Sequence, residues 1–212
     1  MKRILSIGMT LLLAVSLAAC GNGAKEDAAE TAPAEAAEPE TAVSETPAES
    51  SAADKHVLVV FFSETGTTKD IAEKIASVTG GDLYEIKAAQ EYTEEDRNWH
   101  DNESRTTKEQ NDPSIRPEIS SDPVSLTGYD TVFLGYPIWW GQEPRILDTF
   151  VESCDFTDLT VIPFCTSSSS GIGGSGRNLE ALAGTGTWLD GQWFSAGISA
   201  SDVESWVSSL QD

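Results

Sequence analysis

The sequence predicts an α/β protein in which a five-stranded parallel sheet lies between two layers of helices. The run VLVVFF at residues 57–62 is continuously apolar, which is typical of a strand that is buried on both faces. Similar apolar runs recur along the chain and alternate with segments whose apolar residues have helical spacing. Parallel strands need such crossover helices between them, so the expected architecture has three layers, α/β/α.

The first helix and the next two strands follow the run at 57–62. Residues 69–81 carry isoleucine and alanine at a spacing of three and four, and they end in two glycines that favour a helix stop. Residues 83–86 form a second short apolar segment, and residues 131–135 form a third. The pattern therefore predicts one helix and two further strands.

The second half of the chain continues the alternation. Residues 144–153 begin with proline and place their large apolar residues on one face, which predicts a helix. Residues 160–164 are apolar and predict the fourth strand, and a helix is expected around residues 176–183. The fifth strand is expected within residues 188–198.

The chain closes with a predicted helix over residues 202–210, with Ser201 as its N-cap. Cys154 precedes the fourth predicted strand and Cys165 follows it, so an extended strand separates the two thiols by more than a disulfide allows. We therefore expect both cysteines to be free.

The N-terminal segments have a different character. Lys2 and Arg3 precede an apolar run, residues 4–18, that is too short to span a membrane comfortably and is typical of an export signal. The run ends in Leu-Ala-Ala-Cys-Gly, which resembles the lipobox of bacterial lipoproteins, in which Cys20 is lipidated. The alternative is an ordinary signal peptide with a chance cysteine. Residues 1–20 are thus expected to target the protein outside the cytoplasmic membrane, with Cys20 as a lipid anchor.

Residues 21–54 are rich in alanine, glutamate and proline and contain no aromatic residue, so they predict a disordered acidic tether. The folded domain is expected to be residues 55–212. The formal net charge of the chain is −22, which excludes nucleic-acid binding and predicts partners with basic surfaces.

One long polar segment, residues 91–123, does not fit the alternation. Thr93 to Asp96 has the pattern of a helix cap, which predicts a short helix there. Trp99, Arg105 and Arg116 are the expected structural anchors, and no chemistry is assigned to them. The two histidines, His56 and His100, are expected to be solvated rather than catalytic.

The first loop, residues 63–68, joins the first strand to the first helix and carries four hydroxyl side chains and one glycine. Unpaired N–H groups at a helix N-terminus attract an anion, so the loop predicts a phosphate cradle. The alternative is that one hydroxyl simply caps the helix. The loop has neither the P-loop spacing nor the GxGxxG pattern.

The stretch VVFFSETGTTKDIAEKI resembles the N-terminal motif of the flavodoxin family. The resemblance implies a flavodoxin-like fold with strand order 2-1-3-4-5 and bound FMN. It also implies which residues hold the FMN phosphate: Ser63, Thr65, Gly66, Thr67 and Thr68, with Glu64 contributing its backbone N–H.

The second loop, residues 135–144, reads GYPIWWGQEP. It is similar to the loop that lies against the isoalloxazine ring in flavodoxin-like proteins and quinone reductases. The residues implied to line the flavin are Pro137, Ile138, Trp139, Trp140 and Gly141. A planar ring system stacks well on tryptophan. The alternative is that one tryptophan belongs to the core and the other covers a helix.

The third loop, residues 163–176, reads PFCTSSSSGIGGSG and resembles the third flavin loop of the same family. The residues implied to hydrogen-bond the pyrimidine edge are Thr166, Ser167, Ser168, Ser170 and Gly171. The alternative is a plain flexible loop.

Three functions follow from these expectations. The first is an FMN-binding electron-transfer protein, tethered outside the membrane, whose partner is a basic redox protein or a membrane quinone. The second is an FMN-dependent reductase of quinones or similar acceptors, and the third is a non-catalytic binding module. No catalytic residue and no metal site is assigned.

Overall fold

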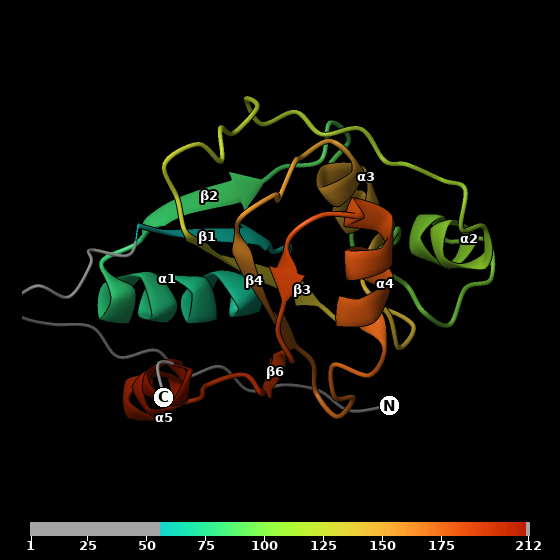
Figure 1. Ribbon diagram of the computed structural model, residues 1–212. Coiled ribbons are helices and arrows are strands. Elements are labelled where there is room, and N and C mark those ends of the chain that lie inside the picture. Colours follow the sequence, from blue (N-terminus) through green and yellow to red (C-terminus); the bar gives the residue numbers. More distant parts are fainter. Residues whose placement is uncertain (1–55, 211–212) are drawn as a thin grey trace, which may run out of the picture. The chain divides into compact units, whose positions relative to one another are not determined.

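The computed structural model describes residues 56–210, which are coloured in Figure 1. The predicted signal, the lipidation site at Cys20 and the acidic tether lie outside the described residues. Among the helices of residues 56–210, none is both long enough and apolar enough to cross a lipid bilayer.

A single parallel sheet forms the centre of the domain. Its strands pair in the order β2-β1-β3-β4-β5, and β6 also pairs with β4, which confirms the predicted fold and strand order. The strands are β1 (Val57–Phe62), β2 (Asp82–Ile86), β3 (Thr131–Pro137), β4 (Thr160–Thr166), β5 (Thr187–Trp188) and β6 (Gln192–Phe194).

The fifth strand is divided, which the sequence pattern did not predict. The Leu159 and Val161 carbonyls accept hydrogen bonds from the Thr187 and Leu189 N–H groups. The backbone N–H and C=O groups of odd-numbered residues along β4 therefore point toward the fifth strand. The next odd-numbered residue is Pro163, which has no N–H to donate. The ladder is interrupted there and resumes with β6 beside residues 164–166.

Residues 56–210 form five helices: α1 (Thr67–Thr79), α2 (Arg105–Asn111), α3 (Arg145–Glu152), α4 (Ser175–Ala183) and α5 (Ala200–Ser209). The last helix begins earlier than predicted. Its N-cap is Ser199, whose hydroxyl accepts a hydrogen bond from the Asp202 N–H at 3.2 Å. The predicted cap, Ser201, lies inside the first turn. The prediction missed the true cap because serine occurs at both positions, and the sequence alone did not distinguish them.

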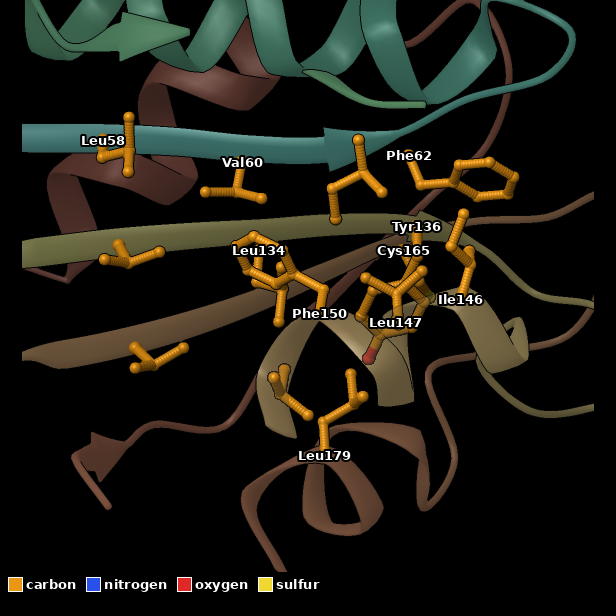
Figure 2. Close-up of a cluster of buried hydrophobic side chains, with 14 of the residues drawn as sticks. Leu58, Val60, Phe62, Leu134, Tyr136, Ile146, Leu147, Phe150, Cys165 and Leu179 are labelled. Carbon is orange, nitrogen blue, oxygen red and sulfur yellow. The ribbon is translucent and has the colours of Figure 1, made fainter. Parts of the chain in front are cut away.

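Alternate residues of the strands supply two hydrophobic clusters, one on each face of the sheet. The odd-numbered side chains of β1 pack with α1 and α5, around Ile71, Ile75 and Val203. The even-numbered side chains of β1 pack toward α3 and α4. Figure 2 shows Leu58 and Val60 of β1 on the same side of the sheet as Leu179 of α4. This period of two is what a buried strand requires.

A close approach between β3 and β4 depends on one glycine. Gly135 is paired in register with Phe164, and a Cβ atom placed on Gly135 would lie 2.1 Å from the Phe164 ring. The Phe164 ring therefore occupies the space that a side chain at residue 135 would need.

The long polar segment 91–123 is ordered by local caps as well as by contacts between distant side chains. Thr93 and Asp96 exchange capping hydrogen bonds of 3.0 and 3.1 Å, but they close a turn and not the predicted helix. The helix of this segment is α2, which starts twelve residues after Thr93 and is capped by Ser104. A hydrophilic seven-residue helix carries little periodicity, so the pattern did not indicate it.

The expected anchors of this segment behave differently from one another. Arg116 forms a bidentate pair with Glu152, and both N–O distances are 2.7 Å. Arg105 donates to Glu109 at 2.7 Å. Trp99 is 65% exposed, so its predicted anchoring role is wrong.

The cysteines and histidines agree with expectation. Cys154 and Cys165 are free, and Cys165 is buried in the sheet. His56 and His100 are both exposed.

Candidate functional site

The first loop ends in a helix start that no side chain caps. The N-cap residue of α1 is Gly66, which has a φ of +83°, a backbone conformation that glycine adopts without strain. None of the neighbouring hydroxyl groups accepts a hydrogen bond from the first turn. The alternative that a hydroxyl of this loop serves as the helix cap is therefore wrong, and the first N–H groups of α1 are left without a side-chain acceptor.

The loop also holds a polar atom without a partner. The Ser63 Oγ atom is buried and forms no hydrogen bond within the described residues. A buried hydroxyl without a partner loses the hydrogen bonds it would make in water. Together with the uncapped start of α1, it fits an anion that accepts hydrogen bonds from several donors.

Thr166 joins the three loops at the carboxyl edge of the sheet. Its hydroxyl lies 2.8 Å from the Thr68 hydroxyl of the first loop, and both side chains are buried. Its carbonyl accepts a hydrogen bond of 2.8 Å from the Ile138 N–H of the second loop. The ends of β1, β3 and β4 are thereby held as one unit.

The second loop folds back as a tight hairpin. Trp139 and Gln142 exchange two backbone hydrogen bonds of 2.9 Å, with Trp140 and Gly141 as the two turn residues. Both turn residues have positive φ, +56° for Trp140 and +78° for Gly141, as a primed two-residue turn requires. A tryptophan at positive φ is strained, and strain of this kind is concentrated at functional sites.

The two tryptophans of this hairpin have different surroundings. The Trp139 ring meets Phe62 and Tyr92 edge to face, with ring centroids 5.6 and 5.1 Å apart. Trp140 is 41% exposed. One tryptophan therefore supports the loop, and the other presents its ring to solvent at the sheet edge.

The third loop is anchored at its start. Trp193 of β6 donates from its indole N–H to the Ser167 hydroxyl at 2.9 Å, and that hydroxyl donates to the Ser170 carbonyl. Ser168, Ser170 and Gly171 are exposed. The loop lies at the same edge as the other two, and the contacts assigned to its residues stay predictions, as do those assigned to the first and second loops.

Burial changes the pKa values of carboxyl groups near the site. Burial raises the pKa of Glu64 in the first loop, and the charge of Arg97 opposes this increase. Burial also raises the pKa of Glu143 to about 7, and the charge of Asp148 adds to the effect. Glu143 follows the hairpin directly and is fully buried, and its Oε1 atom has no partner among the described residues.

Several residues at this edge were not predicted from the sequence. Tyr92 donates its hydroxyl to buried Glu109 at 2.9 Å, and the Arg105 guanidinium lies 3.8 Å from the Tyr92 ring centroid. Arg97 lines a hollow beside the hairpin. Tyr92, Arg97 and Glu109 belong to the polar segment 91–123, where the sequence indicated a helix cap but no site, and Arg105 was expected there only as a structural anchor. Within residues 56–210, no group of three or more His, Cys, Asp or Glu side chains lies together as metal ligands.

Comparison with known proteins agrees with this geometry. The sequence model of the family described as Flavodoxin matches residues 56–210. A protein from Bacteroides eggerthii DSM 20697, assigned as a flavoprotein, is 40% identical, with a TM-score of 0.69 over 74% of this chain and 98% of that chain. A second such protein, from Bacteroides uniformis ATCC 8492, is 42% identical, with a TM-score of 0.69 over 73% and 98% of the two chains.

A more distant structure shares the fold. The flavoprotein from Lactobacillus acidophilus NCFM, solved in complex with FMN, is 21% identical, with a TM-score of 0.52 over 72% of this chain and 99% of that chain. No match to a curated protein was found. The family match covers most of the chain, and the two Bacteroides proteins are similar to it over nearly their whole length. The chain therefore belongs to the flavodoxin family.

Proposed function

We propose that this protein binds FMN at the carboxyl edge of its sheet and carries electrons outside the cytoplasmic membrane. The observation that carries the proposal is the junction at Thr166, which holds the first and second loops against the third within hydrogen-bond distance. Ligands of open parallel sheets bind at this edge, where the strand order changes direction. The FMN complex of the Lactobacillus flavoprotein, which shares the fold, supports the choice of ligand.

The residues present fit the chemical parts of FMN. The phosphate would lie at the uncapped start of α1, within reach of the Ser63 and Thr65 hydroxyls and the Gly66 and Thr67 N–H groups. The isoalloxazine ring would lie against the Trp139–Gln142 hairpin. Its pyrimidine edge would meet the third loop, where exposed serines and backbone groups offer donors and acceptors.

Bound FMN supplies one-electron and two-electron chemistry, and the protein supplies binding, orientation and charge. The excess of acidic over basic residues within 56–210 favours partners with basic surfaces and predicts a low reduction potential for a flavin within this domain. Partner association is expected to weaken as salt screens these charges.

The electron-carrier proposal includes a lipid anchor at Cys20. The apolar run before Cys20 and the lipobox-like Leu-Ala-Ala-Cys-Gly support export and lipidation. Export removes the protein from the cytoplasmic pool of NAD(P)H, which favours a carrier over a reductase that needs this donor. Its proposed partner is a redox protein with a basic surface or a membrane quinone.

A reductase of quinones or similar acceptors is the second candidate, because the second loop is similar to that of quinone reductases. Turnover of NADPH with a soluble quinone by the FMN-loaded chain separates the two functions. A carrier gives slow turnover at every donor concentration, and fast, saturable turnover would replace the carrier proposal by the reductase.

The cofactor proposal is tested by titrating the full chain with FMN and with riboflavin, and following flavin fluorescence. The expected result is quenched fluorescence and a preference for FMN, because the phosphate adds charge-assisted hydrogen bonds. Thr65→Val should weaken FMN binding and leave riboflavin binding unchanged, since Thr65 is exposed and its loss costs the fold little. A folded chain that binds neither flavin would contradict the proposal and favour the non-catalytic binding module.

A further inference from the structure

Arg97 has a polar atom that the folded chain leaves without a partner. Its Nε atom is buried and forms no hydrogen bond within residues 56–210, and Arg97 takes part in no ion pair there. By contrast, Arg105, Arg116 and Arg145 are each paired with a carboxylate. A buried charged donor without an acceptor is costly, so an acceptor supplied by a ligand would stabilise this position.

Arg97 lies at a hollow of about 170 Å³ beside the hairpin of the second loop. Part of the lining comes from residues assigned above to the isoalloxazine ring: Ile138, Trp139 and Trp140. The rest of the lining comes from segment 91–123: Arg97, Trp99 and Thr106. The hollow is therefore part of the proposed flavin site, and Arg97 is the one charged side chain among the residues that line it.

The position of Arg97 is fixed by the fold. Its backbone N–H donates to the Thr93 carbonyl at 3.2 Å, inside the turn that Thr93 and Asp96 close with their side chains. The Thr106 hydroxyl of the hollow already donates to the Asp96 carbonyl at 2.9 Å. The Arg97 guanidinium therefore offers the hollow a donor that Thr106 does not.

The charge of Arg97 also acts on the first loop. Burial raises the pKa of Glu64, and the charge of Arg97 is the largest effect that opposes this increase. Because electrostatic effects fall with distance, Arg97 is close to the first loop as well as to the hairpin of the second. A positive charge at this place is an exception in an acidic domain.

From these observations we propose that Arg97 is a flavin-binding residue, whose guanidinium donates to the isoalloxazine ring and favours the reduced flavin. Reduced flavin carries a negative charge near neutral pH, and a hydrogen bond between two charged groups is about twice as strong as a neutral one. Arg97 thus raises the reduction potential of bound FMN and opposes the acidic residues of the domain. The inference rests on the proposed FMN binding and adds to it a residue outside the three loops.

The assignment to the ring is tested by titrating the full chain and its Arg97→Met variant with oxidised FMN and with riboflavin. The variant is expected to bind both flavins about fivefold more weakly, because it loses a hydrogen bond to the ring that both flavins share. Flavin fluorescence measures both affinities. Weaker binding of FMN alone would place Arg97 at the phosphate and would overturn the assignment to the ring.

The effect on reduction is tested by measuring the midpoint potential of bound FMN against a reference dye, without oxygen. Arg97→Met is expected to weaken the binding of reduced FMN about fiftyfold, against about fivefold for oxidised FMN. This tenfold difference lowers the two-electron midpoint potential by about 30 mV. Arg97→Lys is expected to restore most of the potential, because it keeps the positive charge.

Lys108→Met is the matched control, since it removes one positive charge from the same segment at a side chain that is 57% exposed. Solvent screens this charge, so the potential is expected to stay unchanged. The thermal midpoint of each variant shows whether it is folded. Arg97→Met is expected to keep its thermal midpoint, because the Nε atom has no hydrogen bond to lose.

Two potential measurements would overturn the inference and leave FMN binding standing. One is an unchanged potential in a folded Arg97→Met variant that binds FMN. The other is an equal decrease in Lys108→Met, which would assign the effect to the overall charge of the domain. A folded unmodified chain that binds neither flavin would remove the FMN proposal and this inference together, so the two failures are distinguishable.

Discussion

The first loop and segment 91–123 meet at one edge of the sheet, but they are held in place in opposite ways. In the first loop, the determining residues are neighbours in sequence: a strand end, Gly66 at positive φ, and the start of α1. In segment 91–123, the determining contacts are distant, as between Arg116 and Glu152, which are 36 residues apart. A structure that depends on neighbouring residues can be recognised as a motif in the sequence, whereas an ion pair between distant residues cannot.

The largest expected effect is at Glu109, which joins α2 to Tyr92, 17 residues earlier in the chain. Glu109 is buried, accepts from the Tyr92 hydroxyl at 2.9 Å and pairs with Arg105 at 2.7 Å. Glu109→Ala leaves the Tyr92 hydroxyl and the Arg105 Nε donor without an acceptor, and Arg105 keeps only its bond to the Gln90 carbonyl, so we expect the free energy of unfolding to fall by about 3–5 kcal/mol in a denaturant titration. Glu103→Ala is the control, because its carboxylate is exposed and pairs with Lys108 at 3.1 Å, which is worth at most about 1 kcal/mol. Equal losses in both variants would contradict this account.

The next effect is a pH dependence from Glu143, which is buried after the hairpin. Its pKa is raised from 4.5 to about 7, so between these pH values the folded chain holds a proton that the unfolded chain has released. The contribution of Glu143 to stability is therefore fully present below pH 4.5 and is lost as pH rises through 7. The loss amounts to about 3 kcal/mol, from about 1.4 kcal/mol per pKa unit.

Glu143→Gln isolates this effect, because glutamine has nearly the same shape and no titrating proton. The difference in unfolding free energy between the variant and the unmodified chain should move in favour of the variant between pH 4 and pH 8. A difference that is constant across this range would show that Glu143 does not hold the proton.

The third effect concerns the hairpin of the second loop, whose shape depends on neighbouring residues. Gly141 has a φ of +78°, and Gly141→Ala forces a side chain into that conformation at a cost of about 1–2 kcal/mol. The space around Gly141 is open, so backbone strain alone is expected, and FMN affinity should fall as the hairpin changes shape. Gly171→Ala is the matched control for stability alone, since Gly171 has open space and no positive φ. Similar thermal midpoints for both variants would contradict a strained hairpin.

The smallest effect on stability is expected at Ser63. Its buried Oγ atom has no partner, so Ser63→Ala removes no hydrogen bond and should not lower the unfolding free energy. FMN affinity should nevertheless fall more than riboflavin affinity, because the lost donor would serve the phosphate. Equal affinity losses for both flavins, measured by fluorescence titration, would instead give Ser63 a role in shaping the loop.

The sequence predicted the parts of the fold that local patterns determine. Buried strands such as β1 and β3, and the strand order implied by the family motif, are confirmed. The division of the fifth strand was missed because Pro163 acts on it from a neighbouring strand, across the sheet. The true cap of α5 was missed because Ser199 and Ser201 are chemically equivalent in sequence.

In the candidate site, too, the parts with a local sequence motif were predicted and the others were not. The three loops were predicted at one edge, and the structure places them there, joined through Thr166. Arg97 and Glu143 were not predicted. They stand out because each has a buried polar atom without a partner, and this property exists only in the folded chain.

The contact between Gly135 and Phe164 restricts which substitutions the fold can accept during evolution. A methyl group at residue 135 would collide with the Phe164 ring, and a smaller residue at 164 alone would leave a void on the face of the sheet that α1 and α5 cover. Each substitution alone is therefore expected to destabilise the fold, and the pair of changes is expected to compensate. Within the family, the two positions are therefore expected to covary, so that a side chain appears at one only when the ring is absent from the other.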